Sequence, residues 1–372
     1  MISLCGDIMN VRKCVSGEME KIIETANKCF IPHRDETFTF VNSVPYIYNN
    51  KSYDYSDIHF VIENDEGMIA VGGNLINNIK INNKLYTFSV VGTIGTLPGH
   101  RNKGYMKMIM EEIEKENVSE NLVFSVLTGD RNRYNHYGYE RSCISNNYVF
   151  KKNQVFSNEY NVIVKEYKDE LDELYNVYLE HKKIIVRGKD NFLIHLNNNT
   201  NKLYVAYVGE EIVGYYSLKT NMVVEICIKD IKYLKGVISR MLELGEYEEY
   251  IVMPNILDRD IYLGMYPLAS SHYSYEESCI KIYNDELFLE ILYSLNKDKF
   301  KGEYNEVYKI GNKVYEFNAN SKNIKVVESN KEELYAFDNK YDFIRFALGV
   351  DTLGVDSKIF PMYFDLNRLD RF

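Results

Sequence analysis

The sequence predicts a mixed α/β fold made of two similar units in tandem and a smaller third unit. Residues 85–94 are rich in β-branched and aromatic side chains, which is typical of a strand, and an apolar stripe with helical spacing follows from residue 106. The same order of elements restarts near residue 160. A chain of 372 residues has room for about two or three domains. We therefore expect domains over 1–155, 156–283 and 284–372.

The first unit is predicted to form one sheet with helices before and after its central strand. The turn Asn64-Asp65-Glu66-Gly67 has the residue types that connect hairpin strands. Residues 34–50 are aromatic and irregular, and we expect a loop there. In order, the other elements expected are a strand over 9–16, a helix over 18–30, a hairpin of 60–62 with 68–75, a strand over 85–94, a helix from 106, a strand over 122–127 and a closing strand over 143–150.

The second and third units follow the same kind of pattern. Residues 68–72 and 211–214 are similar in sequence, which favours a duplicated unit. In the second unit we expect strands over 161–166, 203–208, 212–218, 223–228 and 250–253, with helices over 170–181 and 231–244. In the third we expect an amphipathic helix near 287–292, strands over 306–310, 314–317 and 324–327, and a helix over 343–348.

Composition excludes several classes of protein. The net charge is −10, from 54 acidic and 44 basic residues, which argues against binding nucleic acid. This charge either keeps the protein soluble or attracts a cationic substrate. We expect no membrane span, because no apolar run approaches about 18 residues, and no signal peptide. Six scattered cysteines predict free thiols in a reducing cytoplasm, with no metal site.

The most informative segment joins the strand over 85–94 to the helix from 106. A Pro98-Gly99 turn follows the strand, and Gly104 opens the helix, where a residue without a Cβ lets a ligand approach the backbone. The amides of the first helical turn have no partner within the helix and carry partial positive charge. Arg101 and Lys103 add charge. The sequence therefore predicts a site for a phosphate or pyrophosphate.

Two motifs resemble a known family. The segment Thr96-Leu97-Pro98-Gly99-His100-Arg101-Asn102-Lys103-Gly104-Tyr105 resembles the acyl-CoA loop of the GNAT superfamily of N-acetyltransferases. The segment from Leu127 to Tyr139 is similar to the short helix and aromatic turn of the Eis-like branch, named after the mycobacterial enhanced intracellular survival protein. One departure is Met106, where the family has a small residue, and its side chain could crowd the phosphate. The resemblance implies tandem GNAT folds with a sterol-carrier-like α/β domain at the C-terminal end. The second GNAT fold is expected to be degenerate and to have lost cofactor binding, because it has no Arg-x-x-Gly loop.

The resemblance also implies which residues hold acetyl-CoA. The backbone of the central strand would pair with the pantetheine arm as an added strand does, and one N–H there would stabilise the oxyanion. The loop and first helical turn would wrap the pyrophosphate, and a later glycine and aspartate would line the adenine end. The cofactor-binding residues expected are Ile94, Gly95, Thr96, Arg101, Asn102, Lys103, Gly104, Tyr105, Met106, Lys107, Gly129 and Asp130.

Two residues are the candidates for acid–base chemistry. Tyr134 would protonate the departing CoA thiolate, because the two groups have similar pKa values. In Eis-like proteins the terminal carboxylate is the base, which here belongs to Phe372. Alternatively that end is merely frayed, and Asp365 or Asp370 supplies the carboxylate. His100 is expected to be structural, beside the phosphates.

These features predict an acetyl-CoA-dependent N-acetyltransferase that transfers the acetyl group directly to a primary amine. No cysteine lies in either motif, so a covalent acyl-enzyme is not indicated. The acceptor would be an aminoglycoside-like molecule, a polyamine or lysine. Asp35 and Glu36 would meet a cationic acceptor, and the aromatic segment 34–50 would lie over its pocket. We expect a homo-oligomer, with the hexamer of Eis-like relatives as one form. The alternative is a non-catalytic acyl-CoA or lipid-binding protein. A nucleotide-phosphate binder unrelated to acetyl transfer would need a Gly-Lys-Ser/Thr or G-x-G-x-x-G loop, and the sequence has neither.

Overall fold

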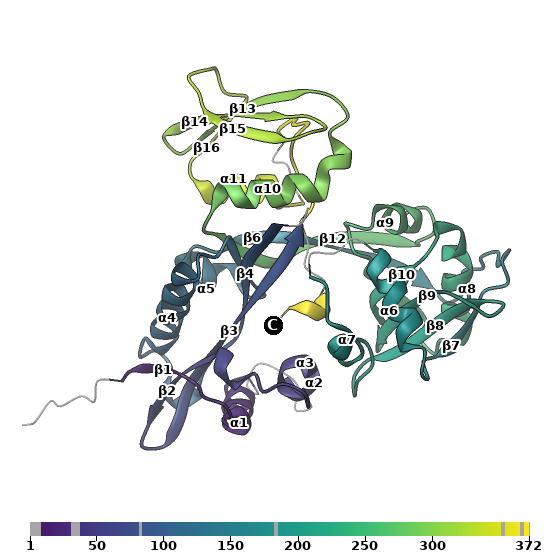
Figure 1. Cartoon of the computed structure of the whole chain (residues 1–372), viewed down its shortest axis with the longest axis horizontal. Coiled ribbons are helices and arrows are strands. Elements are labelled where there is room, and N and C mark those ends of the chain that lie inside the picture. The colour runs from purple at the N-terminus through teal and green to yellow at the C-terminus, as the bar shows by residue number, and fades with distance from the viewer. Residues whose placement is uncertain are drawn as a thin grey trace, which may run out of the picture.

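The computed structural model describes residues 9–30, 38–81, 84–181, 185–350, 354–364 and 368–371. The fold is mixed α/β, as the sequence predicts, and contains three bodies (Figure 1). The N-terminal unit lies at the left of this view, the second unit at the right and the C-terminal unit above them. The last described residues lie between the first two units. Within the described ranges, none of the helices combines the length and the apolar character that crossing a bilayer requires.

A single twelve-stranded sheet runs through the first two units. Its order is β1-β2-β3-β4-β5-β12-β6-β11-β10-β9-β8-β7, so each half has the same succession of strands, read inward from its own edge. The strands are β1 (Val11–Lys13), β2 (His59–Asn64), β3 (Gly67–Ile81), β4 (Lys84–Thr96), β5 (Phe124–Leu127), β6 (Glu140–Lys151), β7 (Ile163–Glu166), β8 (Lys202–Val208), β9 (Glu211–Lys219), β10 (Met222–Ile228), β11 (Glu249–Val252) and β12 (Ser271–Ile282).

The two halves exchange their last strands. Strand β12, from the end of the second unit, pairs with β5 of the first. Strand β6, from the end of the first unit, pairs with β11 of the second, and β6 and β12 pair with each other along most of their length. The expectation that 143–150 closes the first sheet is therefore wrong, because β12 occupies that position. The domain boundary near residue 155 stays a prediction, but the last strand in each half of the sheet comes from the other unit.

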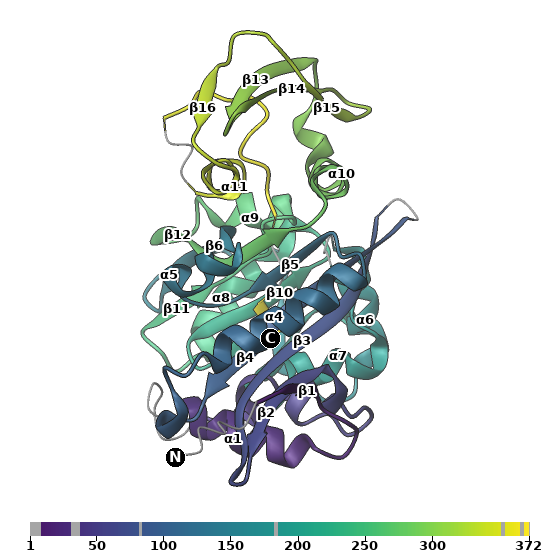
Figure 2. The same cartoon turned by 90° about the vertical axis from the view of Figure 1, so that its left-hand side faces the viewer.

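Helices cover the sheet and carry the loops that matter for function. Helix α4 follows β4 and lies across the strands of the N-terminal unit (Figure 2). The expected loop over 34–50 was wrong in its described part, since 40–48 forms two short helices whose aromatic side chains are buried. The helices of the two halves are α1 (Met19–Phe30), α2 (Phe40–Ser43), α3 (Pro45–Tyr48), α4 (Tyr105–Ser119), α5 (Arg131–Tyr134), α6 (Leu171–Glu180), α7 (Lys189–Leu196), α8 (Leu234–Leu244) and α9 (Arg259–Met265).

The C-terminal unit is a four-stranded sheet with two helices. Its hairpin and its third strand confirm the sequence prediction, whereas the short strand parallel to β13 was not foreseen. Phe124 of β5 packs edge-on against Phe288 and Phe364, so this unit shares its core with the N-terminal sheet. Its elements are α10 (Asp285–Asn296), β13 (Tyr304–Ile310), β14 (Lys313–Ala319), β15 (Ile324–Glu328), β16 (Tyr335–Phe337) and α11 (Lys340–Leu348).

Candidate active site

Strands β4 and β5 separate at the centre of the N-terminal unit. Their parallel pairing ends at Val91 and Leu127, although β4 continues for five more residues to Thr96. Two residues past the last pair, Thr93 has a φ of 55°, and the register between β3 and β4 shifts there. A bulge of this kind bends a strand and ends its pairing. The backbone of Ile94, Gly95 and Thr96 therefore no longer pairs with β5. We call this place, where the two strands part, the slot of the first unit; an unpaired strand edge can accept an added strand.

The loop after β4 leaves the start of α4 open. Gly104 caps the helix in the left-handed conformation, with a φ of 85°, and no side chain caps the first turn. A Cβ placed on Gly104 would meet no atom within 4 Å. The amides at the start of the helix, including those of Tyr105, Met106 and Lys107, face this space without partners within the helix. The side chain of Met106 is partly buried against the core of this unit, so the structure gives no sign that it fills the space.

Two basic residues of the loop hold the loop itself. Arg101 donates to the backbone oxygens of Thr96 at 3.2 Å and Cys29 at 3.0 Å. His100 lies 3.1 Å from the Glu66 carboxylate, which agrees with the structural role expected for it. The guanidinium of Arg101 therefore ties the loop to β4 and α1, whereas Lys103 is exposed beside Gly104. Of the two expected charges, Lys103 is the one whose contacts leave it available to an anion.

Tyr134 lies where the two strands separate. Its side chain is buried in the same apolar cluster as Val91, Ile94 and Leu127. Gly129 makes this position possible, because a Cβ there would come within 2.3 Å of the Tyr134 ring. Burial raises the pKa of Tyr134 to about 12, which keeps the phenol protonated at neutral pH and suits a proton donor. Asp130 accepts from the amide of Asn132 at 2.9 Å and so begins α5; its contact explains the turn.

A polar network on the other side of the β4 bulge was not foreseen from the sequence. The Tyr48 hydroxyl lies 2.6 Å from Thr93 Oγ1 and 3.0 Å from His59 Nε2. His59 Nδ1 lies 3.0 Å from the backbone oxygen of Tyr55. Because a carbonyl only accepts, Nδ1 carries the hydrogen, and burial lowers the pKa of His59 to about 4, so the ring is neutral. No local pattern marks these residues, since 11 and 45 positions separate Tyr48 from its partners.

The C-terminal tail reaches α3, the short helix that carries Tyr48. The Tyr46 hydroxyl donates to the backbone oxygen of Arg371 at 3.2 Å, and Tyr46 lies on the same short helix as Tyr48. The Arg371 guanidinium pairs with Glu277 of β12 at 2.5 Å. Phe372 lies outside the described residues, as do Asp35, Glu36 and Asp365. Asp370 is bound by Arg187 and unsuited to act as the base.

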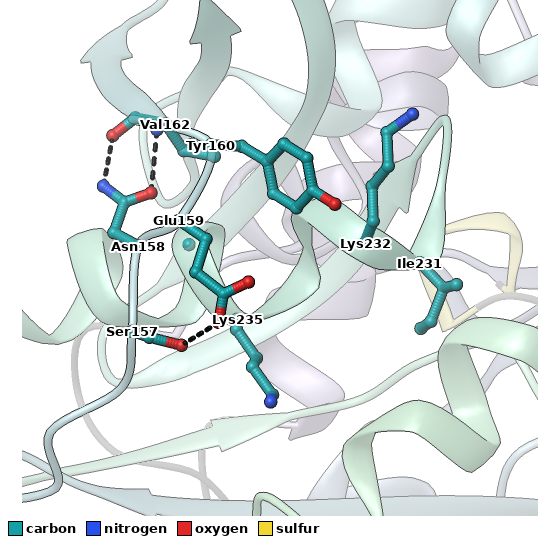
Figure 3. A pocket seen from close by; sticks show the side chains of 9 residues that line it. Ser157, Asn158, Glu159, Tyr160, Val162, Ile231, Lys232 and Lys235 are labelled. Carbon is teal, nitrogen blue, oxygen red and sulfur yellow. Dashed lines mark hydrogen bonds between the residues drawn. The ribbon is translucent and has the colours of Figure 1, made fainter.

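The second unit has a pocket of about 210 Å³ at the start of α8 (Figure 3). Residues 233–236 follow strand β10 and a short helical turn, Ile231–Tyr233. However, the Asp230 carboxylate accepts from the Lys232 amide at 2.9 Å and pairs with the Lys232 ammonium at 3.1 Å. A Cβ on Gly236 would lie 2.6 Å from both Asn158 and Val162. A carboxylate thus caps the short turn Ile231–Tyr233 that leads into α8, and the first turn of α8 is closely packed at Gly236.

Comparisons with known proteins agree with this geometry. Residues 10–142 match the family described as the acetyltransferase (GNAT) domain. The fold resembles a conserved protein of Enterococcus faecalis V583, described as a "Probable N-Acyltransferase" (TM-score 0.66, 15% identity, 98% of this chain and 100% of that one). It also resembles a GCN5-related N-acetyltransferase of Anabaena variabilis (0.66, 11%, 98% and 100%) and Eis1 of Mycobacterium abscessus (0.60, 11%, 92% and 90%). No curated protein matches the sequence.

The fold and the matched domain define the class of protein. The N-terminal part carries a GNAT acetyltransferase domain, and the protein is an acyltransferase by class. The solved structures share its fold over nearly the whole chain at 10–15% identity, so they support the architecture and leave the acceptor to be argued from the site.

Proposed function

We propose that the N-terminal unit binds acetyl-CoA and transfers its acetyl group directly to a primary amine. One observation carries the proposal: the split between β4 and β5 lies beside an uncapped helix start, and Tyr134 is buried between them. The diverging backbone of Ile94, Gly95 and Thr96 would pair with the pantetheine arm. The amides from Asn102 to Lys107 would hold the pyrophosphate, together with the charge of Lys103. Gly129 and Asp130 would then contribute to the wall of the cofactor site by fixing the position of α5.

The chemistry needs an oxyanion donor, a base and an acid. A backbone N–H of the diverging part of β4 would stabilise the oxyanion that forms when the amine attacks the thioester carbon. Tyr134, protonated at neutral pH, would give its hydrogen to the departing thiolate. The terminal carboxylate of Phe372 would take the proton of the attacking amine. In support, the residue before it is anchored by Tyr46, whose helix also touches the β4 bulge through Tyr48.

The acceptor is proposed to be a cationic amine, such as an aminoglycoside-like molecule, a polyamine or a lysine side chain. The net charge of −10 favours the approach of such molecules. The resemblance to Eis-like proteins supports the same acceptors, a homo-oligomer such as a hexamer, and a sterol-carrier-like fold for the C-terminal unit. The division into domains at 1–155, 156–283 and 284–372 belongs to the same proposal.

Thiol release from acetyl-CoA in the presence of a panel of amines tests this function. We expect release with at least one aminoglycoside, polyamine or lysine peptide, and a loss of turnover on deleting Phe372 with CoA binding retained. Measured CoA binding without thiol release with any amine would favour the alternative, a non-catalytic acyl-CoA or lipid-binding protein. Failure to bind CoA at all would contradict both.

A further inference from the structure

The second unit repeats the strand split of the first. Strands β10 and β11 pair in parallel only at Met222–Ile251 and Val223–Val252, and then separate. As in β4, the register with the preceding strand shifts at this point, between Val223 and Glu225. The duplicated architecture therefore places a second slot in the position that the thioester arm is proposed to occupy in the first unit.

This second slot is filled by the protein itself. Its lining includes Glu225 of β10, Met253 and Asn255 after β11, and the side chains of Arg187 and Asp370. About 20 Å³ of space remains, which is enough for about one water molecule and far too little for a pantetheine arm. Two of the side chains that line this space, Arg187 and Asp370, come from segments outside the strands of the split.

Arg187 connects the slot to the tail. Its Nε and Nη2 contact the two Asp370 carboxylate oxygens at 2.6 and 3.1 Å, a bidentate pair. The same guanidinium contacts Glu225 at 3.1 and 2.8 Å. All three side chains are at least 94% buried. A buried charge triad is weak evidence for stability, because desolvation offsets much of the attraction, but its fixed geometry can specify position.

Two further contacts fix the same stretch of chain. His195 Nδ1 lies 2.9 Å from the backbone oxygen of Leu369, and the ring stacks on Tyr46 with the ring centroids 4.4 Å apart. The tail is therefore held at Leu369 and Asp370 by the second unit and at Arg371 by Tyr46 of the first. Phe372 is the next residue along the chain.

We propose that the second strand split is a clamp for the C-terminal tail, in which Arg187 and Glu225 fix Asp370 so that the terminal carboxylate is presented to the site of the first unit. This inference deepens the proposed function and rests on it for the role of the carboxylate. Arg187 and Asp370 are positioning residues, since they act through the tail. The second unit would thereby contribute to transfer without binding acetyl-CoA.

The variant Asp370→Asn tests the clamp. It keeps the side-chain volume and an oxygen acceptor, and Arg187 retains Glu225, so the full-length protein should fold. We expect carboxypeptidase A to release Phe372 about tenfold faster than from the native protein, because local opening becomes easier. We expect kcat to fall about tenfold and the Kd for acetyl-CoA to stay within about twofold, since the cofactor site lies elsewhere.

The matched control is Asp230→Asn, which removes an exposed carboxylate of the same unit and should change neither Phe372 release nor kcat. Combining Asp370→Asn with deletion of Phe372 should lower kcat no further than the deletion alone, because both changes act through one group. Unchanged release of Phe372 overturns the clamp, and faster release with unchanged kcat overturns its positioning role. If the native protein binds CoA but transfers acetyl to no amine, the proposed function fails, whereas the release assay still decides whether the slot holds the tail.

Discussion

The two halves of the long sheet share one order of strands and differ where the strands separate. In the first half, the helix after the split begins at Gly104 with open space around it. In the second, Asp230 caps the short turn that leads into α8, and Gly236 is packed against Asn158 and Val162. The slot of the first half borders the buried phenol of Tyr134, and that of the second contains an ion triad.

If the proposed cofactor site is right, few side chains separate a ligand site from a structural one. A carboxylate at a helix start satisfies the amides that an anion would otherwise bind. A guanidinium in the slot recruits a carboxylate of the chain itself in place of a ligand. The backbone architecture, the bulge and the parallel pairing are the same in both halves, so function here follows the side chains and not the fold.

Among variants that test the difference between the two halves, Tyr134→Phe is expected to have the largest effect on kcat. Loss of the proton donor should lower kcat by about 100- to 1000-fold, a range typical of general acid catalysis, with CoA binding retained. The matched control is Tyr262→Phe, because Tyr262 is the fourth residue of α9 as Tyr134 is of α5. Steady-state thiol release measures both. Equal losses in the two variants, or a Tyr134→Phe variant with native kcat, would remove Tyr134 from the mechanism.

A smaller effect is expected from moving the same ring without changing it. In Gly129→Ala the new Cβ would lie 2.3 Å from the Tyr134 ring, which must shift. We expect kcat to fall about tenfold, since displacement of a catalytic group by about 1 Å is expensive. Gly99→Ala, whose Cβ meets nothing within 4 Å, is the control and should retain its activity. A native rate in Gly129→Ala would show that the ring position does not limit transfer.

The two helix starts are distinguished by charge reversal. Lys103→Glu places a carboxylate beside the open start of α4 and should raise the Kd for CoA about tenfold, equal to about 1.4 kcal/mol. Lys235→Glu makes the same change at the pocket that begins α8 and should leave that Kd unchanged. Calorimetric titration with CoA measures both. A raised Kd for CoA in Lys235→Glu, together with an unchanged Kd in Lys103→Glu, would contradict our proposal and place the cofactor in the second half.

The local signals in the sequence were sufficient for the elements and the loop, and insufficient for what distant residues make together. The turn Pro98-Gly99, the opening Gly104 and the apolar stripe of α4 lie within about two dozen residues, so periodicity and turn chemistry predict them. Strand β12 was missed because its position depends on exchange between units, over 140 residues from β5. Likewise, 183 residues separate Arg187 from Asp370, and no pattern in the sequence announces a bidentate pair at that range.

The smallest effect concerns the two histidines buried in the two halves, His59 beside the first split and His195 beside the tail. Burial lowers the pKa of His59 to about 4; burial, and then the charge of Arg187, lowers that of His195 to about 3. Both pKa values are below the ordinary 6.5, so the unfolded chain binds protons first as the pH falls. The stabilising effect of each neutral ring is complete above pH 6.5 and is lost as the pH falls toward the folded-state pKa.

Each ring should therefore lower the free energy of unfolding by about 1.4 kcal/mol per pH unit below 6.5. Urea unfolding between pH 7 and 5 measures this slope. The variant His59→Gln should reduce the slope of the unfolding free energy against pH by about 1.4 kcal/mol per pH unit, which corresponds to one proton. The variant His136→Gln, at an exposed position, should leave the slope unchanged. A native slope in His59→Gln would mean that the ring near the β4 bulge is already protonated in the folded protein. In that case Nε2 would donate to the Tyr48 hydroxyl, whose own hydrogen would go to Thr93 Oγ1.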